Sequence, residues 1–158
     1  MAANETIVFS IEEFDLRVLN RRIHAMPDTG VIATIEKGSP RAAITAGLFN
    51  TLKISIIKSS LYTATINVLP GSSDDAWLFG AAQETENSGL ILTMSAVHQT
   101  SKWISDACVI MADPTVTFSS DGTEVNAWTI SGNFPLVNMG KFVNPGTLTA
   151  DQVTASLQ

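Results

Sequence analysis

The sequence predicts a mainly-β protein, an antiparallel β-sandwich or barrel with one flanking α-helix. Many short segments alternate apolar and polar residues with a period of two, which is typical of half-buried strands. Turn-forming stretches such as Pro27–Gly30 and Ser119–Gly122 separate these segments. Apolar residues recur clearly at helical spacing only after Pro70, so we expect one helix to pack against the strands.

The clearest strand covers residues 61–69. One face would carry Tyr62, Ala64, Ile66 and Val68, and the other Thr63, Thr65 and Asn67. Pro70-Gly71 ends this strand, and Ser72 or Ser73 then begins a helix as its N-cap. Asp74 and Asp75 lie in the first turn, where the helix dipole favours negative charge. The apolar face of this helix lies over residues 76–83 and consists of Trp77, Leu78, Ala81 and Ala82, and the helix fades by residues 87–89.

The N-terminal part predicts three more strands and one long loop. Residues 6–9 form a possible edge strand, residues 14–18 alternate clearly, and residues 31–35 follow the Pro27–Gly30 turn. Residues 36–52 include an apolar stretch without firm periodicity at residues 42–48, and we predict a long loop, with at most a short extended piece, that can lie on a neighbouring subunit. Residues 52–57 and 61–69 would then form one long strand or a bent pair.

The C-terminal half predicts a further set of strands. Residues 90–95 alternate, and residues 103–111 carry apolar side chains on both faces, which suggests a strand covered on both sides. Ser119–Gly122 is a strong hairpin turn, after which Trp128, Ile130 and Phe134 share one face of a return strand. Residues 144–158 read as a C-terminal extension that ends in a weak helix.

Composition limits the possible functions. The 158 residues fit a single domain, and the one cysteine rules out an intrachain disulfide. Only 15% of residues are charged, which favours contacts with other protein surfaces. The net charge of −6 and the scattered basic residues argue against gripping nucleic acid through phosphates. The N-terminus resembles no signal peptide and no apolar run is long enough to span a bilayer, so we expect no membrane association.

The sequence contains no recognisable set of catalytic residues, and we predict that the protein is not an enzyme. His24 and His98 are the only histidines, and no Gly-x-Ser-x-Gly elbow or phosphate-binding glycine loop is present. Cys108 falls in an apolar strand, where a thiol is usually an inert core residue. Trp77, Trp103 and Trp128 each lie on an apolar periodic face, and we predict that all three pack in the core. Asp74 and Asp75 diverge on a helix and cannot share a proton. No catalytic residue, metal ligand or cofactor is therefore predicted.

The order of these features resembles that of the tail tube proteins of tailed bacteriophages, in particular virion structural proteins of contractile-tailed phages. The resemblance covers residues 9–134. It comprises the Phe14–Val18 strand, the alternating strand that runs into the capped helix, the Ala107–Met111 strand, and the Asn126–Gly132 strand. One departure is Asn20-Arg21, which stands where a glycine-bearing hairpin is expected.

This resemblance implies a β-barrel-like protomer whose hexameric rings stack into a hollow tube for DNA ejection. Its partners would be the tail sheath, the tape-measure protein and baseplate or terminator proteins, and viral DNA would pass through without sequence-specific binding. The protein would belong to the virion tail and would assemble in the host cytoplasm. Residues 36–52 would bridge subunits, with the interface candidates Lys37, Ser39, Arg41, Ile44, Leu48 and Phe49. An acidic subunit lets DNA slide, and the acidic candidates for the lumen are Asp15, Asp106 and Glu124, all of which we expect to lie on strands.

Three other functions stay open on the sequence. A tube protein of a bacterial contractile injection system would share the fold. A monomeric β-barrel module for small ligands would need a closed apolar pocket. A decoration or capsid-stabilising protein would bind capsids or form trimers instead of growing tubes.

Overall fold

A computed structural model describes residues 9–122 and 124–139. It confirms the mainly-β antiparallel class with one helix. The long sheet has the strand order β2-β1-β7-β8-β9-β6-β3, and β10 adds to the side of β8. The strands are β1 (Phe14–Val18), β2 (Arg21–Arg22), β3 (Ala33–Lys37), β6 (Leu61–Val68), β7 (Leu92–His98), β8 (Ser101–Ala112), β9 (Asn126–Asn133) and β10 (Leu136–Asn138). A separate hairpin pairs β4 (Ala42–Ala46) with β5 (Leu52–Ile56).

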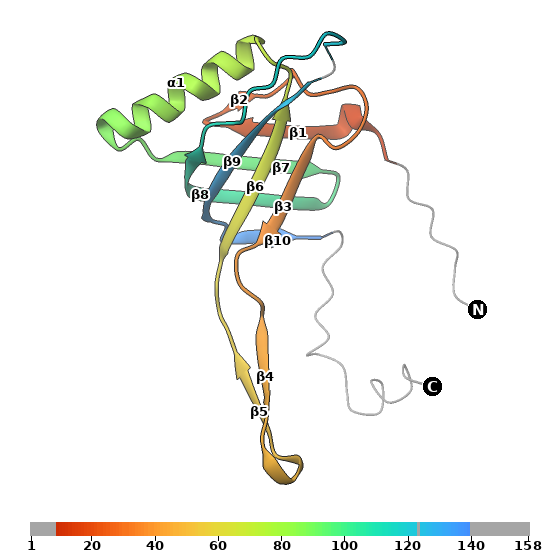
Figure 1. The fold of residues 1–158 in the computed structure, drawn as a ribbon, viewed down its shortest axis with the longest axis vertical. Helices are drawn as coiled ribbons and strands as arrows, with labels where there is room; N and C mark the ends of the chain where they lie inside the picture. Colours follow the sequence, from red (N-terminus) through yellow and green to blue (C-terminus); the bar gives the residue numbers. More distant parts are fainter. Residues whose placement is uncertain (1–8, 123, 140–158) are drawn as a thin grey trace, which may run out of the picture.

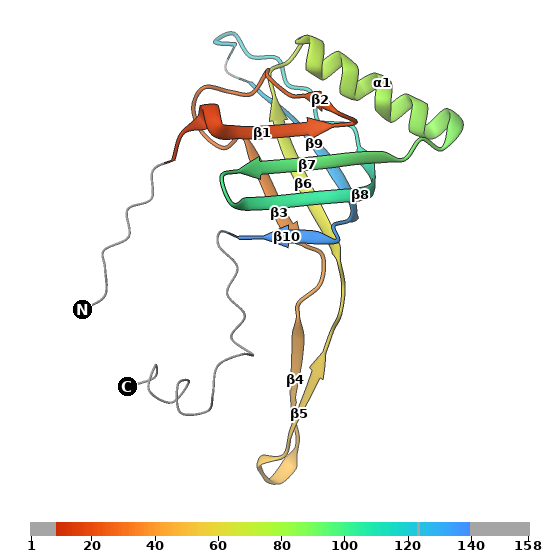
Figure 2. The ribbon, with the colours of Figure 1, turned by 180° about the vertical axis from the view of Figure 1, so that it is seen from behind.

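The long sheet bends back over its own apolar face. β1, β7, β8 and β10 run across the direction of β3, β6 and β9 (Figures 1 and 2). Buried residues from both groups of strands, including Leu16, Met94, Ile66 and Ile130, belong to one core cluster. The sheet is therefore sandwich-like, with a single core between two crossing layers.

A bulge and a close approach of two strands help to produce this bend. The β7–β8 register shifts between Leu92 and Met94, so that Ser105 and Cys108 are both buried. The predicted alternation over residues 103–111 is therefore wrong after this bulge. The prediction that both faces of this strand are covered is also wrong, because Met111 is exposed. At Gly132 in β9, a Cβ atom would overlap the carbonyl oxygen of Ala107 and the Cα of Cys108. Only glycine permits this contact.

The helix α1 (Ser73–Ser88) begins at the predicted cap and ends where the sequence predicts it to fade, at residues 87–89. The Ser72 hydroxyl accepts a hydrogen bond from the Asp75 N–H, and Gly89 ends the helix in the left-handed region. Leu78, Ala81 and Ala82 enter the core, while Trp77 is half-buried against it.

The two aspartates at the start of α1 connect the helix to distant parts of the chain. Asp74 accepts hydrogen bonds from the backbone N–H groups of His24 and Ala25, at 2.8 and 2.9 Å, and pairs with Arg21 at 3.0 Å. Asp75 accepts from the indole N–H of Trp128 at 2.9 Å and from Asn126 at 3.0 Å. The sequence predicted only their favourable position on the helix dipole, and it missed these tertiary contacts.

Several predicted elements need correction. Residues 36–52 are not a loop, because β3 extends to Lys37 and β4 lies inside this segment. β5 and β6 do not form one long strand, since β5 pairs only with β4 among the described strands. Residues 6–8 and the extension 144–158 lie outside the described residues. The unusual first turn is a two-residue hairpin in which Leu19 and Asn20 both have positive φ.

Candidate assembly site on a projecting hairpin

A two-stranded arm, here defined as residues 38–60, projects from the body of the protein. It contains β4, a short 3-10 turn at Leu48–Asn50, and β5. Figures 1 and 2 show it extending away from the ends of β3 and β6, with no other element beside it. The base is held by the Gly38 N–H, which donates to the carbonyl of Leu61.

The pairing register gives the arm one apolar and one polar face. Ile44 lies opposite Ile54, while Thr45 lies opposite Lys53 on the other face. Side chains of paired residues in an antiparallel ladder lie on the same side. The apolar face therefore consists of Ala42, Ile44, Ala46, Leu52, Ile54 and Ile56. The polar face consists of Ala43, Thr45, Lys53 and Ser55.

Most of this apolar face is exposed. Ile44, Leu52, Ile54 and Ile56 are between 57% and 70% exposed. Because burying such a side chain fully yields about 1.5–3 kcal/mol, these four leave roughly 4–8 kcal/mol of hydrophobic free energy unused. An isolated two-stranded hairpin is at best marginally stable in water. We therefore expect the arm to gain stability by packing against another surface.

The tip of the arm is also apolar, and it is strained. Leu48 and Phe49 are 82% and 96% exposed. Phe49 and Asn50 both adopt positive φ, at 58° and 60°. This region is unfavourable for a bulky residue such as phenylalanine. Strain of this kind persists mainly where it serves a function, and an exposed aromatic ring at a strained tip is suited to insertion into a partner.

The structure places five of the six predicted interface residues on this arm. Ile44 lies on its apolar face and Leu48 and Phe49 at its tip, whereas Ser39 and Arg41 lie near the base. Lys37 lies at the end of β3, where its ammonium group sits 5.9 Å from the centroid of the Tyr62 ring. The sequence missed Leu52, Ile54 and Ile56 as part of this surface. Their period-two spacing was visible, but only the pairing with β4 shows which face they share.

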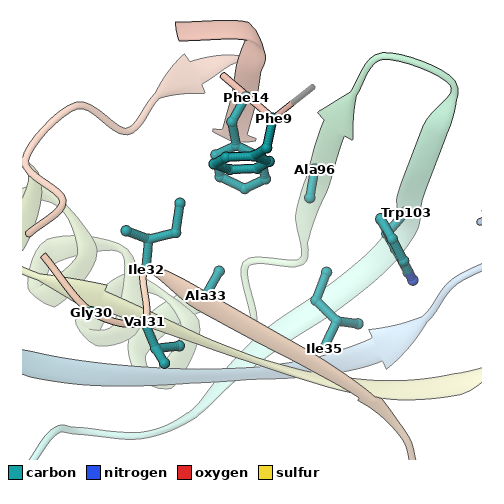
Figure 3. Close-up of a pocket in the computed structure, with 9 residues that line it drawn as sticks. All are labelled: Phe9, Phe14, Gly30, Val31, Ile32, Ala33, Ile35, Ala96 and Trp103. Carbon is teal, nitrogen blue, oxygen red and sulfur yellow. The ribbon is translucent and has the colours of Figure 1, made fainter. Parts of the chain in front are cut away.

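A second apolar surface lies in the body, as a groove of about 380 Å³. It opens between β3 and the strands β1, β7 and β8, so it lies where the two ends of the bent sheet approach each other. Figure 3 shows side chains from all these elements around it. Its lining side chains are apolar except for the indole N–H of Trp103, and they include Phe9, Phe14, Val31, Ile35 and Ala96.

The outward face of β3, β6 and β9 is polar and almost uncharged. Register places Thr34 beside Thr65 and Thr65 beside Thr129, and a second row joins Glu36, Thr63 and Ser131. Thr63 and Ser131 are hydrogen-bonded at 3.2 Å. No lysine or arginine occupies the outward positions of these three strands, all of which are described, so this face offers no cation for phosphates.

The three predicted lumen residues lie in different settings. Asp15 lies on β1 and pairs with Arg17 at 3.0 Å. Asp106 is exposed on β8 and accepts a hydrogen bond from Asn133. Glu124 does not lie on a strand as predicted, because it precedes β9 in the connection from β8. The structure does not gather these three carboxylates on a single strand.

The residues examined for catalytic chemistry form no reactive set. Cys108 is buried in β8 and its Sγ lies 3.3 Å from the carbonyl oxygen of Leu92. Burial raises the pKa of this thiol; a hydrogen bond with Ser105 opposes part of the rise, and the Asp106 carboxylate adds to the rise to a smaller extent. His24 is exposed, and His98 stacks on Phe9 with ring centroids 4.7 Å apart. Within residues 9–122 and 124–139, no group of histidine, cysteine and acidic side chains could hold a metal ion.

Comparison with known proteins assigns no family to the chain. No protein-family model matches the sequence, and a search of curated proteins gives no significant match. Across the part of the chain that the structure describes, no helix has the length and apolar character needed to cross a membrane. The function is therefore inferred from the fold and from the arm, the groove and the polar face described above.

Proposed function

We propose that this protein is the structural subunit of a phage tail tube, in which hexameric rings stack into a hollow conduit for DNA ejection. The observation that carries the proposal is the arm, which presents a continuous apolar face that its own chain leaves exposed. A neighbouring copy is the natural cover for such a face, because each copy in a ring or stack offers the same surfaces in the same places.

The polar surfaces support passage of DNA through such a tube. A protein that grips duplex DNA uses lysine and arginine against phosphates, and its affinity grows with their number. The outward positions of β3, β6 and β9 carry mostly hydroxyl and amide side chains, with the Glu36 carboxylate as their one charged group. With a net charge of −6 on the chain, such a wall lets a polyanion slide.

Under this proposal the protein belongs to the virion tail and assembles in the host cytoplasm. Its other partners would be the sheath, the tape-measure protein and baseplate or terminator proteins. The tube of a bacterial contractile injection system would use the same subunit architecture, and the genes beside this one would separate the two. A decoration protein would be recognised by capsid binding.

The apolar groove favours a second candidate, a monomeric module that binds a small apolar ligand. Its volume falls within the usual range for ligand pockets, roughly 300–1,000 Å³. Such pockets also contain a few convergent polar groups that orient the ligand. The side chains that line this groove offer only one polar group, the indole N–H of Trp103, which favours protein side chains as its occupant.

Negative-stain microscopy and sedimentation of the purified protein over a range of concentrations test the proposal. We expect annular particles or tubes above a critical concentration. The matched variant replaces residues 40–59 by Asn-Gly, which removes most of the arm and keeps Ser60, whose carbonyl accepts the Phe134 N–H. This variant should fold and stay monomeric. A wild-type protein that remains a monomer at every concentration contradicts the proposal.

A further inference from the structure

We propose that the tip of the arm inserts into the apolar groove of a second copy of this chain, in a head-to-tail contact. This inference rests on the tail-tube proposal and adds the receiving surface. It assigns the strained tip and the unfilled groove, two separate apolar features, to a single contact.

The chemistry of the two surfaces matches. The tip offers Leu48 and Phe49, which are the most exposed large apolar side chains of the arm. The groove offers aromatic and aliphatic walls, with Phe9 and Phe14 on one side and Val31 and Ile32 nearby (Figure 3). Its volume of about 380 Å³ exceeds the ~150 Å³ of a cavity that accepts a benzene ring. Neither the tip at Leu48–Asn50 nor the groove lining carries a formal charge, so docking buries no ion.

The path of the chain makes this contact intermolecular. The groove is lined by residues 30–33 and Ile35, at the beginning of β3, whereas the arm begins at Gly38, just beyond its end. The arm therefore continues away from its own groove (Figures 1 and 2). The ten residue-to-residue steps from Gly38 to Leu48 span at most about 33 Å, longer than the eight-residue β6, so the arm can cross the sheet of a neighbour.

A tip and a groove on opposite ends of one protomer form a heterologous contact. Such contacts propagate from copy to copy and produce stacks, because each bound copy presents a new free groove or arm. Growth of a tube by addition of rings requires this property. A contact between two identical patches would stop at a dimer.

Disulfide trapping in the assembling full-length protein tests the inference. We would mix the single variants Phe49→Cys and Val31→Cys and oxidise them, with Phe49→Cys and Val116→Cys as the matched control. Val31 and Val116 are 60% and 53% exposed, and the native Cys108 is buried. We expect an intermolecular disulfide at least tenfold more abundant with Val31→Cys than with Val116→Cys.

The possible outcomes separate this inference from the tail-tube proposal. Tubes that form with equal cross-linking at both sites overturn the groove inference and leave the tube proposal intact. A disulfide within one chain of an Ile7→Cys and Val31→Cys double variant would identify the N-terminal segment as the occupant, and would overturn it too. A monomer at every concentration refutes both.

A charge at the groove provides a second measurement. Val31→Asp should raise the critical concentration for assembly at least tenfold, because a carboxylate at the rim opposes entry of an apolar tip. Val116→Asp should change it less than threefold. Equal effects of the two variants, with unchanged melting temperatures, contradict the inference.

Discussion

Replacing the apolar pair Ile44 and Ile54 by serine tests the arm most directly. These residues face each other across β4 and β5, and they are 66% and 59% exposed. Their replacement should leave the folding of the body unchanged, because neither side chain belongs to the core cluster. It should weaken assembly if a neighbouring copy covers this face.

The expected magnitude follows from the exposed fractions. Full burial of one such side chain yields about 1.5–3 kcal/mol, so burying the exposed two-thirds of both yields roughly 2–4 kcal/mol. Since 1.4 kcal/mol corresponds to a factor of ten, the critical concentration should rise roughly 30- to 700-fold. Quantitative pelleting over a concentration series measures this rise directly, and negative-stain images identify what is pelleted.

The matched control is the pair Thr45→Ser and Lys53→Ser, which lies directly opposite on the polar face of the same hairpin. This variant should assemble within about threefold of the wild type. If both double variants assemble like the wild type, the apolar face is not a subunit contact and the reasoning is refuted. If both double variants lose assembly equally, the substitutions act through the stability of the hairpin itself and not through burial of its apolar face.

Three further predictions concern the stability of the folded chain. Burial by itself raises the pKa of Asp74, but the backbone hydrogen bonds from Ala25 and His24 and the interaction with Arg21 outweigh it and hold the pKa below its ordinary value. The Asp74 carboxylate therefore stabilises the fold at pH values above about 4, and this contribution declines as the pH falls toward the lowered pKa. Denaturant titration should show a loss of about 2–4 kcal/mol for Asp74→Asn at pH 7 that shrinks below pH 4, and exposed Asp28→Asn should show neither effect. Trp128→Ala should cost about 3–5 kcal/mol because the indole is 2% exposed; a loss below about 1 kcal/mol would mean that its burial and its bond to Asp75 contribute little. Gly132→Ala should cost about 3 kcal/mol or more, because the new methyl group meets backbone, whereas Gly80→Ala on the open side of α1 should stabilise by about 0.5–1 kcal/mol. Equal changes in melting temperature for the two glycine variants would contradict the close contact of Gly132 in β9 with the backbone of β8.

The part of the fold that depends on local periodicity could be predicted from the sequence. The alternation from Tyr62 to Val68 placed the buried face of β6 correctly, and Ser72 was identified as a possible helix cap. Burial of Trp128 and Cys108 also followed from their apolar strands and is confirmed. Trp77 and Trp103 were predicted as core residues, and both are only half-buried at its edge.

The arm could be predicted only in part. Its segment was expected to contact other subunits, but it was described as a loop because alanines occupy both faces of β4 and hide the alternation. A strand without a contrast between its faces has no readable period. Pairing with β5 supplies the missing contrast, since the isoleucines and the leucine of that strand lie opposite Ala42, Ile44 and Ala46.

The sequence by itself determined the class of the protein: its strands, its single capped helix, its low charge and the absence of a recognisable catalytic motif. These properties depend on residues close together in the chain, where hydrophobic period and turn chemistry act. The tertiary structure decided the rest. It set the strand order, the bulge in β8, the second role of Asp74 and Asp75, and the groove between Phe14 and Val31. Each of these depends on residues tens of positions apart, whose proximity is fixed only when the sheet bends around its core.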